Sequence, residues 1–244
     1  MKNCIIIPAR FNSKRIPGKP LLNLKGKPLI IKTIEKLKKK INLEHIYVCT
    51  DDKKVAEIVD KKIINKSIII KKYCLNGTER CSLALKKIKK KYKYVTIVSC
   101  DMPFIEADVI KNIEKKFKIN QNNTDGVTVH CKINDKRILK EINIAKITVS
   151  KNNRILYITR SAIPYSKKFF KGKFFSHHGI MMLKWNVLKE YIKLKNTSLQ
   201  ILEDNEWLKL IENDYILRSY EYKKLKPEIN TKKDIKKFFP IKVK

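Results

Sequence analysis

The sequence predicts an α/β fold, in which a mostly parallel β-sheet with helices on both faces is joined to a small β-rich extension. Two observations predict it. In the first half of the 244 residues, short apolar runs rich in Ile and Val alternate with segments of helical periodicity, as in parallel sheets. In the second half, from residue 126 onward, the pattern changes, because three strand-like runs follow one another before the next helical segment.

The first half contains an alternating series of strands and helices. The predicted strands are short β-branched runs at residues 3–7, 45–50, 66–71 and 94–99. The predicted helices, which place apolar residues three and four apart, cover residues 28–40, 53–59, 81–92 and 106–117. Polar loops follow the strands at residues 9–20, 51–52, 76–80 and 100–101. Because ligands of such sheets lie outside the carboxyl ends of the strands, these loops are the expected site.

The second half predicts strands at residues 126–132, 144–150, 155–158 and 215–220, with a hairpin turn at Asn152-Asn153. Helical patterns cover residues 185–194 and 198–212, and a last helix is expected in the lysine-rich segment beyond Ile235. No internal repeat and no low-complexity linker interrupts the chain. We therefore expect a single domain over residues 1–244.

The charge of the chain is strongly positive and widely dispersed. Its formal net charge is +34, from 57 Lys and Arg against 23 Asp and Glu, yet only seven of the basic residues are Arg. Proteins that recognise nucleic acid more often concentrate Arg and exposed aromatic residues on one element. The composition therefore predicts no specific nucleic-acid partner. A nonenzymatic, basic nucleic-acid-binding protein is the less favoured alternative.

The cysteines and the apolar runs indicate a compartment. Six cysteines are scattered without a C-x-x-C pair, and no apolar run is long enough to cross a membrane. Pro8 and Arg10 interrupt the first apolar run before it reaches the length of a signal peptide. These features predict a cytoplasmic protein with reduced thiols and no membrane partner.

The loop after the first predicted strand has the composition of a triphosphate site. Residues 8–21 read PARFNSKRIPGKPL, which places several cations, one hydroxyl and one Gly at the mouth of a parallel sheet. A triphosphate requires positive charge and backbone N–H groups that it can approach closely. The loop is not a Walker A motif, because Pro20 follows Gly18-Lys19, and it lacks the dinucleotide fingerprint. A solvated basic loop is the alternative.

This segment resembles the A-R-x-x-S-x-R-x-P-G-K-P-L signature of the 3-deoxy-manno-octulosonate (Kdo) cytidylyltransferases, and the match continues at residues 26–28. The resemblance implies a Rossmann-like nucleotidyltransferase fold of the nucleotide-diphospho-sugar transferase type. It also implies that four residues of the loop hold the phosphates of CTP: Arg10, Ser13, Arg15 and Lys19. Sialic-acid cytidylyltransferases share only the beginning of the loop, so they are the more distant relatives.

Two further stretches resemble the nucleotide site of the family. Residues 76–80, NGTER, are similar to its S-G-T-E-R segment and imply nucleotide contacts by Thr78 and Arg80. Residues 98–103, VSCDMP, are similar to V-Q-G-D-E-P, in which Ser99 takes the place of a nucleotide-contacting Gln. Without the resemblance, the first stretch is simply a turn that begins a helix.

The same comparison implies a metal site. Asp101 falls on the metal-binding aspartate of the family, where a hard carboxylate can hold Mg²⁺ against phosphate oxygens. Asn230 falls on its second metal-binding aspartate, and an amide oxygen is a weaker ligand because it has no charge. The alternative is that Asn230 caps the last helix with its side chain. The resemblance thus implies Mg²⁺ as cofactor, with Lys19, Arg10 and Asp101 as catalytic residues.

Three residues of the second half resemble the sugar site of the family. Arg160 lies in YITRSAIP, similar to Y-F-S-R-A-x-I-P, and its planar fork suits a sugar carboxylate. His177 lies in HHGI, similar to H-x-G-I, and Glu206 lies in a segment similar to L-E-x-L. A structural histidine is the alternative for His177. The aromatic residues that usually follow in the family are replaced by Met and Leu at residues 181–183.

Taken together, the resemblance implies transfer of CMP from CTP to the anomeric hydroxyl of Kdo, which releases pyrophosphate and supplies CMP-Kdo for lipopolysaccharide. It also implies a homodimer, with the dimer contact and the sugar site in a subregion at residues 126–185. The main alternative is a sister nucleotidyltransferase that acts on another sugar acid such as sialic acid, because the sequence departs from the family chiefly at the sugar site.

Overall fold

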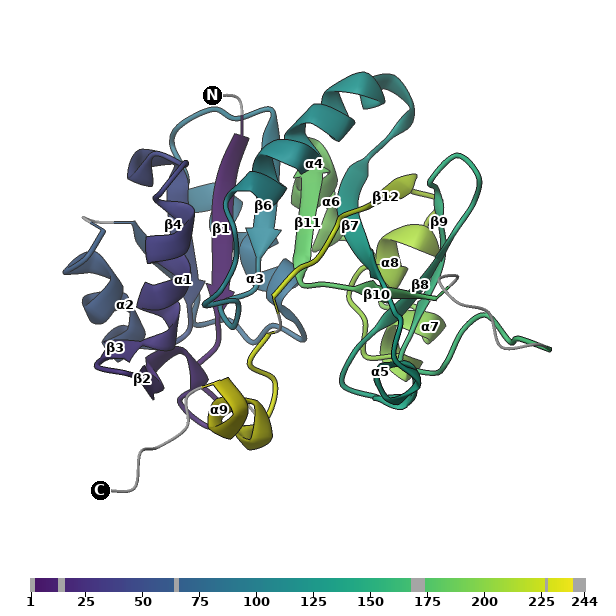
Figure 1. The fold of residues 1–244 in the computed structure, drawn as a ribbon. Helices are drawn as coiled ribbons and strands as arrows, with labels where there is room; N and C mark the ends of the chain where they lie inside the picture. Colours follow the sequence, from purple (N-terminus) through teal and green to yellow (C-terminus); the bar gives the residue numbers. More distant parts are fainter. Residues whose placement is uncertain (1–2, 13–15, 64–65, 168–173, 227, 239–244) are drawn as a thin grey trace. The chain divides into compact units, whose positions relative to one another are not determined.

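The computed structural model describes residues 3–12, 16–63, 66–167, 174–226 and 228–238, with only the backbone of Lys232. The chain divides into two compact units (Figure 1). The first contains residues 1–108 and 226–244, and the second contains residues 109–225. The expectation of a single domain stays a prediction. The subregion at residues 126–185 lies wholly within the second unit.

The first unit contains a parallel sheet with the strand order β5-β4-β1-β6. Its strands are β1 (Asn3–Ala9), β4 (Ile46–Thr50), β5 (Ser67–Ile69) and β6 (Tyr94–Val98). Every residue of β4 and β6 is buried, which is why these strands are continuous apolar runs without alternation. Strand β1 extends beyond its predicted end, because Pro8 still pairs with Cys49 in the register of β4. All four predicted strands of this half are confirmed.

Helices and one hairpin complete the first unit. They are α1 (Leu29–Leu37), α2 (Lys53–Asp60), α3 (Gly77–Ala84) and α9 (Lys232–Phe238), with the short strands β2 (Asn23–Leu24) and β3 (Lys27–Pro28). Helix α1 buries the apolar face that its periodicity predicts. The prediction of a loop at residues 76–80 is wrong. Helix α3 begins at Gly77, because the side chain of Asn76 accepts a hydrogen bond from the backbone N–H of Glu79 and caps the helix.

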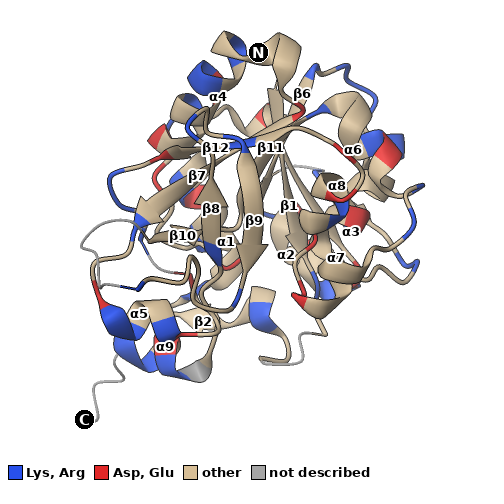
Figure 2. Cartoon of the chain, turned by 90° about the vertical axis from the view of Figure 1, so that its right-hand side faces the viewer, with Lys and Arg blue, Asp and Glu red and all other residues tan. Residues whose placement is uncertain are grey.

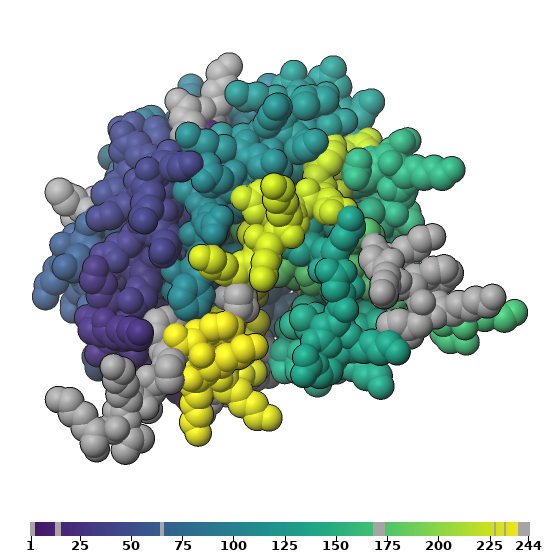
Figure 3. All heavy atoms as spheres, viewed as in Figure 1, coloured from purple at the N-terminus to yellow at the C-terminus, as the bar shows by residue number. Residues whose placement is uncertain are grey.

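The C-terminal segment packs onto the beginning of the chain within the first unit. Ile229 is fully buried in a cluster with Leu24 and Leu29, and Ile235 and Phe238 of α9 pack against the same cluster. Figure 3 shows α9 at the surface of the molecule. Burial of this apolar face therefore holds residues 229–238 against β2 and the beginning of α1.

The second unit is the β-rich part of the chain. Its strands are β7 (Gly126–Lys132), β8 (Lys146–Val149), β9 (Ile155–Thr159), β10 (Phe175–His177), β11 (Ile180–Lys184) and β12 (Leu217–Glu221). Strand β7 pairs antiparallel with β10 and β11 and parallel with β12, and β8 joins β10 to β9. Gly126 begins β7 where an added Cβ would lie 2.5 Å from a side-chain atom of Leu183, so only Gly fits there. The predicted hairpin turn is confirmed by the antiparallel pairing of β8 with β9.

One expectation for the second unit is wrong, and two of its strands were not predicted. Residues 198–212 form two short helices, α7 (Ser198–Leu202) and α8 (Leu208–Ile211), because Asp204 adopts a positive φ of 47° that ends the first helix. Strands β10 and β11 were not predicted; pairing with β7 stabilises them where their own sequence gives little signal. The remaining helices are α4 (Asp108–Ile119), α5 (Lys136–Lys140) and α6 (Trp185–Tyr191).

The surface and the thiols agree with the composition. Lys and Arg occur on most of the helices and loops visible in Figure 2, with acidic residues between them. All six cysteines are free, and Cys100 is the one among them that is partly exposed. Across the described ranges, none of the helices has both the length and the apolar character needed to cross a membrane.

Candidate active site

The loop that follows β1 is closed by backbone hydrogen bonds and fastened to the sheet. The N–H of Gly18 donates to the carbonyl of Phe11 at 3.0 Å, and Gly18 has a φ of +67°, which other residues rarely adopt. The N–H of Phe11 donates to Asp51 Oδ1 at 3.0 Å, so the carboxylate at the end of β4 holds the loop. Arg10 lies at the start of the loop with an exposed side chain. Ser13 and Arg15 lie outside the described residues.

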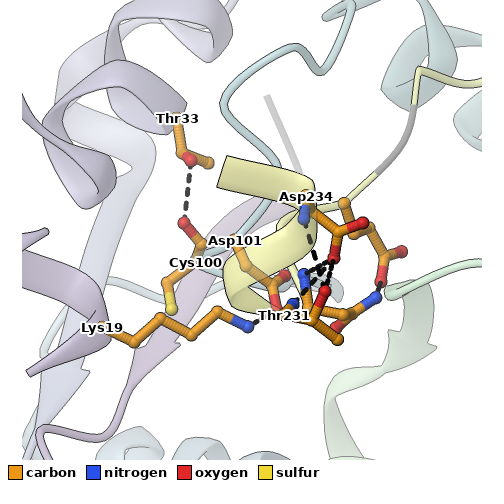
Figure 4. Close-up of polar contacts among 8 residues, drawn as sticks. Lys19, Thr33, Cys100, Asp101, Thr231 and Asp234 are labelled. Carbon is orange, nitrogen blue, oxygen red and sulfur yellow. Dashed lines mark hydrogen bonds and ion pairs between the residues drawn. The ribbon is translucent and has the colours of Figure 1, made fainter. Parts of the chain in front are cut away.

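Lys19 and Asp101 form a close ion pair at the carboxyl end of β6 (Figure 4). The Nζ atom of Lys19 lies 2.5 Å from Asp101 Oδ2, and the two side chains are 11% and 14% exposed. Burial alone would lower the pKa of Lys19, but the negative charge of Asp101 outweighs it and raises the pKa overall. The ammonium is therefore charged at neutral pH, as contact with a triphosphate requires.

One oxygen of Asp101 is buried without a partner. Asp101 Oδ1 has no hydrogen-bond donor among the described residues, although Oδ2 of the same carboxylate accepts from Lys19. A buried, unpaired carboxylate oxygen costs free energy, on the order of 1–3 kcal/mol or more for a charged group. Such an atom marks a position where a cation or a donor from a ligand would restore a favourable interaction.

Contacts from two other elements hold the backbone of Asp101 in place. Thr33 Oγ1, from α1, donates to the carbonyl of Cys100 at 2.9 Å (Figure 4). The N–H of Ile229 donates to the carbonyl of Asp101 at 3.0 Å. Burial and the adjacent Asp101 carboxylate raise the pKa of Cys100 to about 12, so the thiol stays protonated. Cys100 is therefore a packing residue of this segment and not a thiolate nucleophile.

Asn230 directly follows Ile229, whose N–H binds the carbonyl of Asp101. The side chain of Asn230 does not cap α9. Thr231 and Asp234 form the cap: Asp234 Oδ2 accepts from the N–H of Thr231 at 2.7 Å, and Thr231 Oγ1 accepts from the N–H of Asp234 at 3.3 Å (Figure 4). The side chain of Asn230 instead donates from Nδ2 to Glu228 Oε2 at 3.5 Å. The alternative that Asn230 caps the last helix with its side chain is therefore wrong.

Arg80 and Thr78 lie in the first turn of α3. Arg80 is buried, and its guanidinium donates to the carbonyl of Ile70 at 2.8 Å and to Asp51 Oδ2 at 3.2 Å. Thr78 is fully buried. The Asp51 carboxylate thus binds both the Arg80 guanidinium and the backbone N–H of Phe11. Arg80 therefore supports the loop after β1 by holding Asp51 in place. Ser99 is half-buried and directly follows β6.

In the second unit, the guanidinium of Arg160 is bound by its own surroundings. Nε donates to the carbonyl of Glu203 at 3.2 Å, and Nη1 donates to the carbonyl of Ile142 at 3.2 Å. Nη2 donates to the backbone and the carboxylate of Asp204. The Glu203 carboxylate accepts from the backbone N–H of Arg160 at 2.9 Å and from Thr159 Oγ1 at 2.7 Å. Glu203 therefore fixes the position of Arg160.

His177 lies at the end of β10 and is neutral. Burial, and to a smaller extent the neighbouring His178 and His130, lower its pKa to about 3. Its Nε2 atom lies 3.5 Å from Thr128 Oγ1, and its ring packs edge-on against Trp207 with the centroids 4.6 Å apart. At neutral pH His177 can exchange hydrogen bonds with a ligand but offers it no positive charge.

Glu206 and Trp207 belong to a short segment, residues 203–207, that contacts both Arg160 and His177. Trp207 is 4% exposed, and its indole Nε1–H has no acceptor among the described residues. The carbonyl of Glu206 accepts from Tyr191 Oη at 2.7 Å. The segment that contains Glu203 contacts Arg160, and Trp207 contacts His177. The three residues that resemble the sugar site are thus gathered around one short segment of the second unit.

Several residues of these sites were not singled out from the sequence. They are Thr33, Glu203, Trp207, Glu228 and Asp234. Asp51, by contrast, belongs to the polar loop at residues 51–52, which was expected to contribute to the site because it follows a buried strand. Glu203 and Glu228 carry no such signal. Thr159 and Arg160, the partners of Glu203, lie far from it in the sequence, and the contact of Glu228 with Asn230 depends on the fold. Within the described residues, no three His, Cys, Asp or Glu side chains are arranged to hold a metal by themselves.

Comparison with known proteins identifies the family of the chain. The chain belongs to the cytidylyltransferase family, which it matches over residues 4–226. It is therefore an enzyme of the nucleotidyltransferase class. The α/β fold class is confirmed, and the nonenzymatic nucleic-acid-binding alternative is set aside.

Individual relatives narrow the comparison. The chain is 34% identical over 238 residues to the mitochondrial 3-deoxy-manno-octulosonate cytidylyltransferase of Arabidopsis thaliana, covering 95% of this chain and 80% of the relative. It is 33% identical over 224 residues to the 3-deoxy-manno-octulosonate cytidylyltransferase of Fusobacterium nucleatum subsp. nucleatum, covering 91% and 89%. A solved structure of CMP:2-keto-3-deoxy-manno-octonic acid synthetase complexed with CTP matches with a TM-score of 0.87 and 26% identity, covering 98% of this chain and 97% of the other. The resemblance to Kdo cytidylyltransferases is confirmed.

Proposed function

We propose that this enzyme transfers CMP from CTP to the anomeric hydroxyl of Kdo and releases pyrophosphate, supplying CMP-Kdo for lipopolysaccharide biosynthesis. Relatives with this activity in their names match nearly the whole chain, and a solved relative with CTP bound shares the fold. The observation that carries the proposal is the charged Lys19–Asp101 pair at the carboxyl ends of a parallel sheet.

The reaction is an in-line displacement at phosphorus. The anomeric oxygen of the sugar forms a bond to the α-phosphorus of CTP, the bond from that phosphorus to the bridging oxygen breaks, and pyrophosphate leaves with the electron pair. The proton of the hydroxyl is lost to solvent. No covalent enzyme intermediate is needed, so catalysis consists of positioning and of offsetting the charge of the phosphates.

The residues of the first unit provide these two functions. Lys19 is a charged ammonium in a partly buried site, where its interaction with phosphate is stronger than in water. Arg10 begins the same loop with an exposed side chain that can reach a ligand, and we assign Ser13 and Arg15 to the same task. We assign Thr78 and Ser99 to the nucleotide. Arg80 is assigned to the support of the loop through Asp51, because its guanidinium is already bound by Ile70 and Asp51.

The residues at the sheet end fit a Mg²⁺ ion. The buried, unpaired Oδ1 atom of Asp101 is a hard anionic oxygen, which is the ligand type that Mg²⁺ prefers. Mg²⁺ commonly takes one or two carboxylates and completes its shell with water and substrate phosphates, so a larger protein cage is not required. When bound, the ion would offset the negative charge that develops on the phosphates. Asn230 is a candidate second ligand.

We assign recognition of the sugar acid to Arg160, His177 and Glu206 of the second unit. The segment at residues 203–207 connects them. The indole N–H of Trp207, which has no acceptor in the described part of the chain, adds a buried donor beside His177. A buried polar group that lacks a partner discriminates strongly between ligands that satisfy it and ligands that do not. This supports recognition of one particular sugar acid by hydrogen bonds.

A homodimer in the cytoplasm completes the proposal. Four apolar side chains of the subregion at residues 126–185 are exposed: Ile138, Ile142, Leu156 and Tyr165. Exposed apolar groups of this kind are typical of contacts with another protein chain, and we assign them to a second copy. The six free thiols suit a reducing compartment. Light scattering of the pure protein measures the oligomeric state, and a monomer at micromolar concentration would contradict the dimer.

The function is tested by incubating pure protein with CTP, Mg²⁺ and one sugar acid at a time, and by measuring pyrophosphate release. We expect release with Kdo at a kcat/KM far above that with sialic acid. Higher kcat/KM with sialic acid would favour the sister enzyme. No release with any sugar acid, from protein that still binds CTP, would overturn the proposed reaction.

A further inference from the structure

Two cysteines that have no part in the proposed reaction lie beside the anchor of the loop that follows β1. Cys49 belongs to β4 and Cys81 to α3, and both side chains are fully buried. Their Sγ atoms lie 3.7 Å apart, at the distance of a weak S–H···S hydrogen bond. The two residues are 32 positions apart in the sequence, so the fold brings the two thiols together.

The two sulfur atoms are close to the separation of a disulfide bond. An S–S bond is about 2.05 Å long, so the sulfurs at 3.7 Å need to approach each other by roughly 1.6 Å. Strand β4 is held on both sides, because it lies between β1 and β5 in the sheet. Helix α3, which packs against β1 and β4, is a short element of eight residues. A small movement of this helix toward β4 therefore closes the bond.

We propose that Cys49 and Cys81 form an oxidative modification site, which hydrogen peroxide closes into a disulfide between β4 and α3. The thiolate of one cysteine attacks an oxygen of the peroxide, which gives a sulfenic acid and hydroxide, and the hydroxide takes up the thiol proton to form water. The second thiol then attacks the sulfenic sulfur, the S–S bond forms, and the hydroxyl group leaves with the second thiol proton as another water. Two thiols are oxidised, and one peroxide is reduced to two waters.

The burial of the pair decides how this reaction proceeds. Both thiols are shielded from solvent while α3 is packed, so the peroxide reaches them when the helix opens locally. The sulfenic acid then meets the second sulfur as soon as the helix returns, because the two atoms lie 3.7 Å apart in the closed structure. Closure to the disulfide therefore precedes further oxidation to a sulfinic acid, which is the irreversible product.

The disulfide acts on the loop after β1 through two residues next to the pair in the sequence. Asp51 follows Cys49 by two positions, and Arg80 directly precedes Cys81. Arg80 Nη2 donates to Asp51 Oδ2 at 3.2 Å, and Asp51 Oδ1 accepts from the N–H of Phe11 at 3.0 Å. A shift of α3 displaces the guanidinium that holds Asp51, and with it the loop. Because this loop is assigned to the phosphates of CTP, the effect on CTP binding rests on the proposed function.

The test measures the modification and its consequence separately. Native protein is treated with hydrogen peroxide, the remaining thiols are blocked, and mass spectrometry of proteolytic peptides identifies the disulfides. Calorimetry in excess Mg²⁺ measures the Kd of CTP for reduced, oxidised and re-reduced protein. Cys49→Ala and Cys81→Ala each remove one sulfur of the pair. Cys74→Ala is the matched control, because Cys74 is a buried thiol of the same unit whose Sγ donates to the carbonyl of Lys72.

We expect a Cys49–Cys81 disulfide in wild type and in Cys74→Ala, and no disulfide in the two variants of the pair. Oxidised wild type should bind CTP about tenfold or more weakly, because a displacement on the order of 1 Å is costly in a positioned site. Dithiothreitol should return the Kd to the value of the reduced protein. In Cys49→Ala and Cys81→Ala the peroxide should leave the Kd unchanged.

Three results would overturn the modification site: no disulfide in native protein, a disulfide that forms only in urea, or a link to Cys74 in place of Cys81. A disulfide that leaves the Kd of CTP unchanged, or an equal loss of affinity in Cys81→Ala, would overturn its effect on the loop. Failure of reduced wild type to bind CTP would instead contradict the proposed function, and the peptide map would still decide the modification site.

Discussion

The two units of the chain use charge in opposite ways. In the first unit, Lys19 remains charged and faces Asp101, one oxygen of which has no partner among the residues that the structure describes. In the second unit, Arg160 has its guanidinium bonded to backbone carbonyls, and His177 is neutral because of burial. The first arrangement suits a highly charged ligand and a cation. The second suits a ligand that is recognised by shape and by hydrogen bonds.

The largest effect is expected from removal of the negative charge of Asp101. Asp101→Asn should lower kcat about 100-fold or more, because the metal loses a charged ligand and Lys19 loses its ion-pair partner. Pyrophosphate release at saturating CTP measures it. The control is Asp108→Asn, which removes an exposed carboxylate of the same unit that pairs with Lys40 on the surface. Equal turnover in Asp101→Asn and Asp108→Asn would show that the charge at the sheet end is not used.

Removal of the ammonium is expected to have the next largest effect. Lys19→Ala should lower kcat/KM about tenfold or more, which corresponds to ~1.4 kcal/mol of transition-state stabilisation. The reason is the loss of the charged, partly buried donor that we assign to the triphosphate. Lys27→Ala is the matched control, because Lys27 lies nearby in the sequence and forms an exposed pair with Glu35. Turnover in Lys19→Ala like that of Lys27→Ala would remove Lys19 from the site.

A smaller effect is expected from the residue that holds Arg160. Glu203→Gln places an amide where the backbone N–H of Arg160 and Thr159 Oγ1 both donate. Loss of charge-assisted hydrogen bonds of this kind should lower the free energy of unfolding by about 1–3 kcal/mol. If Glu203 positions Arg160 for the sugar, KM for Kdo should rise severalfold while KM for CTP stays unchanged.

The control for Glu203 is Glu190→Gln, which removes a carboxylate that pairs with Lys193 at an exposed site. Chemical denaturation measures the stability of both variants, and initial rates at varied Kdo and CTP measure the two KM values. A purely structural role would lower stability without separating the KM values. That result would leave the second unit without a positioning residue.

The fold and the position of the loop that we assign to the phosphates were largely predictable, and the reasons are local. The buried strands β1, β4 and β6 are apolar runs, and the motif with Gly18 and Lys19 lies in one continuous loop. The strands β10 and β11 and the turn at Asp204 depend on pairing and on a single positive φ, which the local sequence does not specify. The pairings of Lys19 with Asp101 and of Arg160 with Glu203 join distant parts of the chain. Neither partner could be inferred from spacing alone.

The last and smallest expected effect is a change in stability with pH, caused by the titration of His177. In the folded state burial lowers its pKa to about 3, whereas an unfolded chain has a value near 6.5. Between these two values the unfolded chain binds a proton that the folded chain does not, so stability is fully present above pH 6.5 and is lost as the pH falls toward 3. His130 and His178, each with a pKa lowered to about 4 by burial, act in the same direction.

Urea unfolding of wild type at several pH values between 7.5 and 5 should therefore show decreasing stability. Each buried histidine contributes about 1.4 kcal/mol per pH unit once the unfolded chain is fully protonated. His177→Gln removes one titrating group, so its stability should depend on pH less steeply by about that amount. At pH 7.5 the wild-type imidazole is already neutral, and CTP binding should not change in the variant. Equal slopes for wild type and His177→Gln would mean that the folded protein also protonates His177 in this range. The second unit would then hold a titratable positive charge, and the contrast with the first unit would fail.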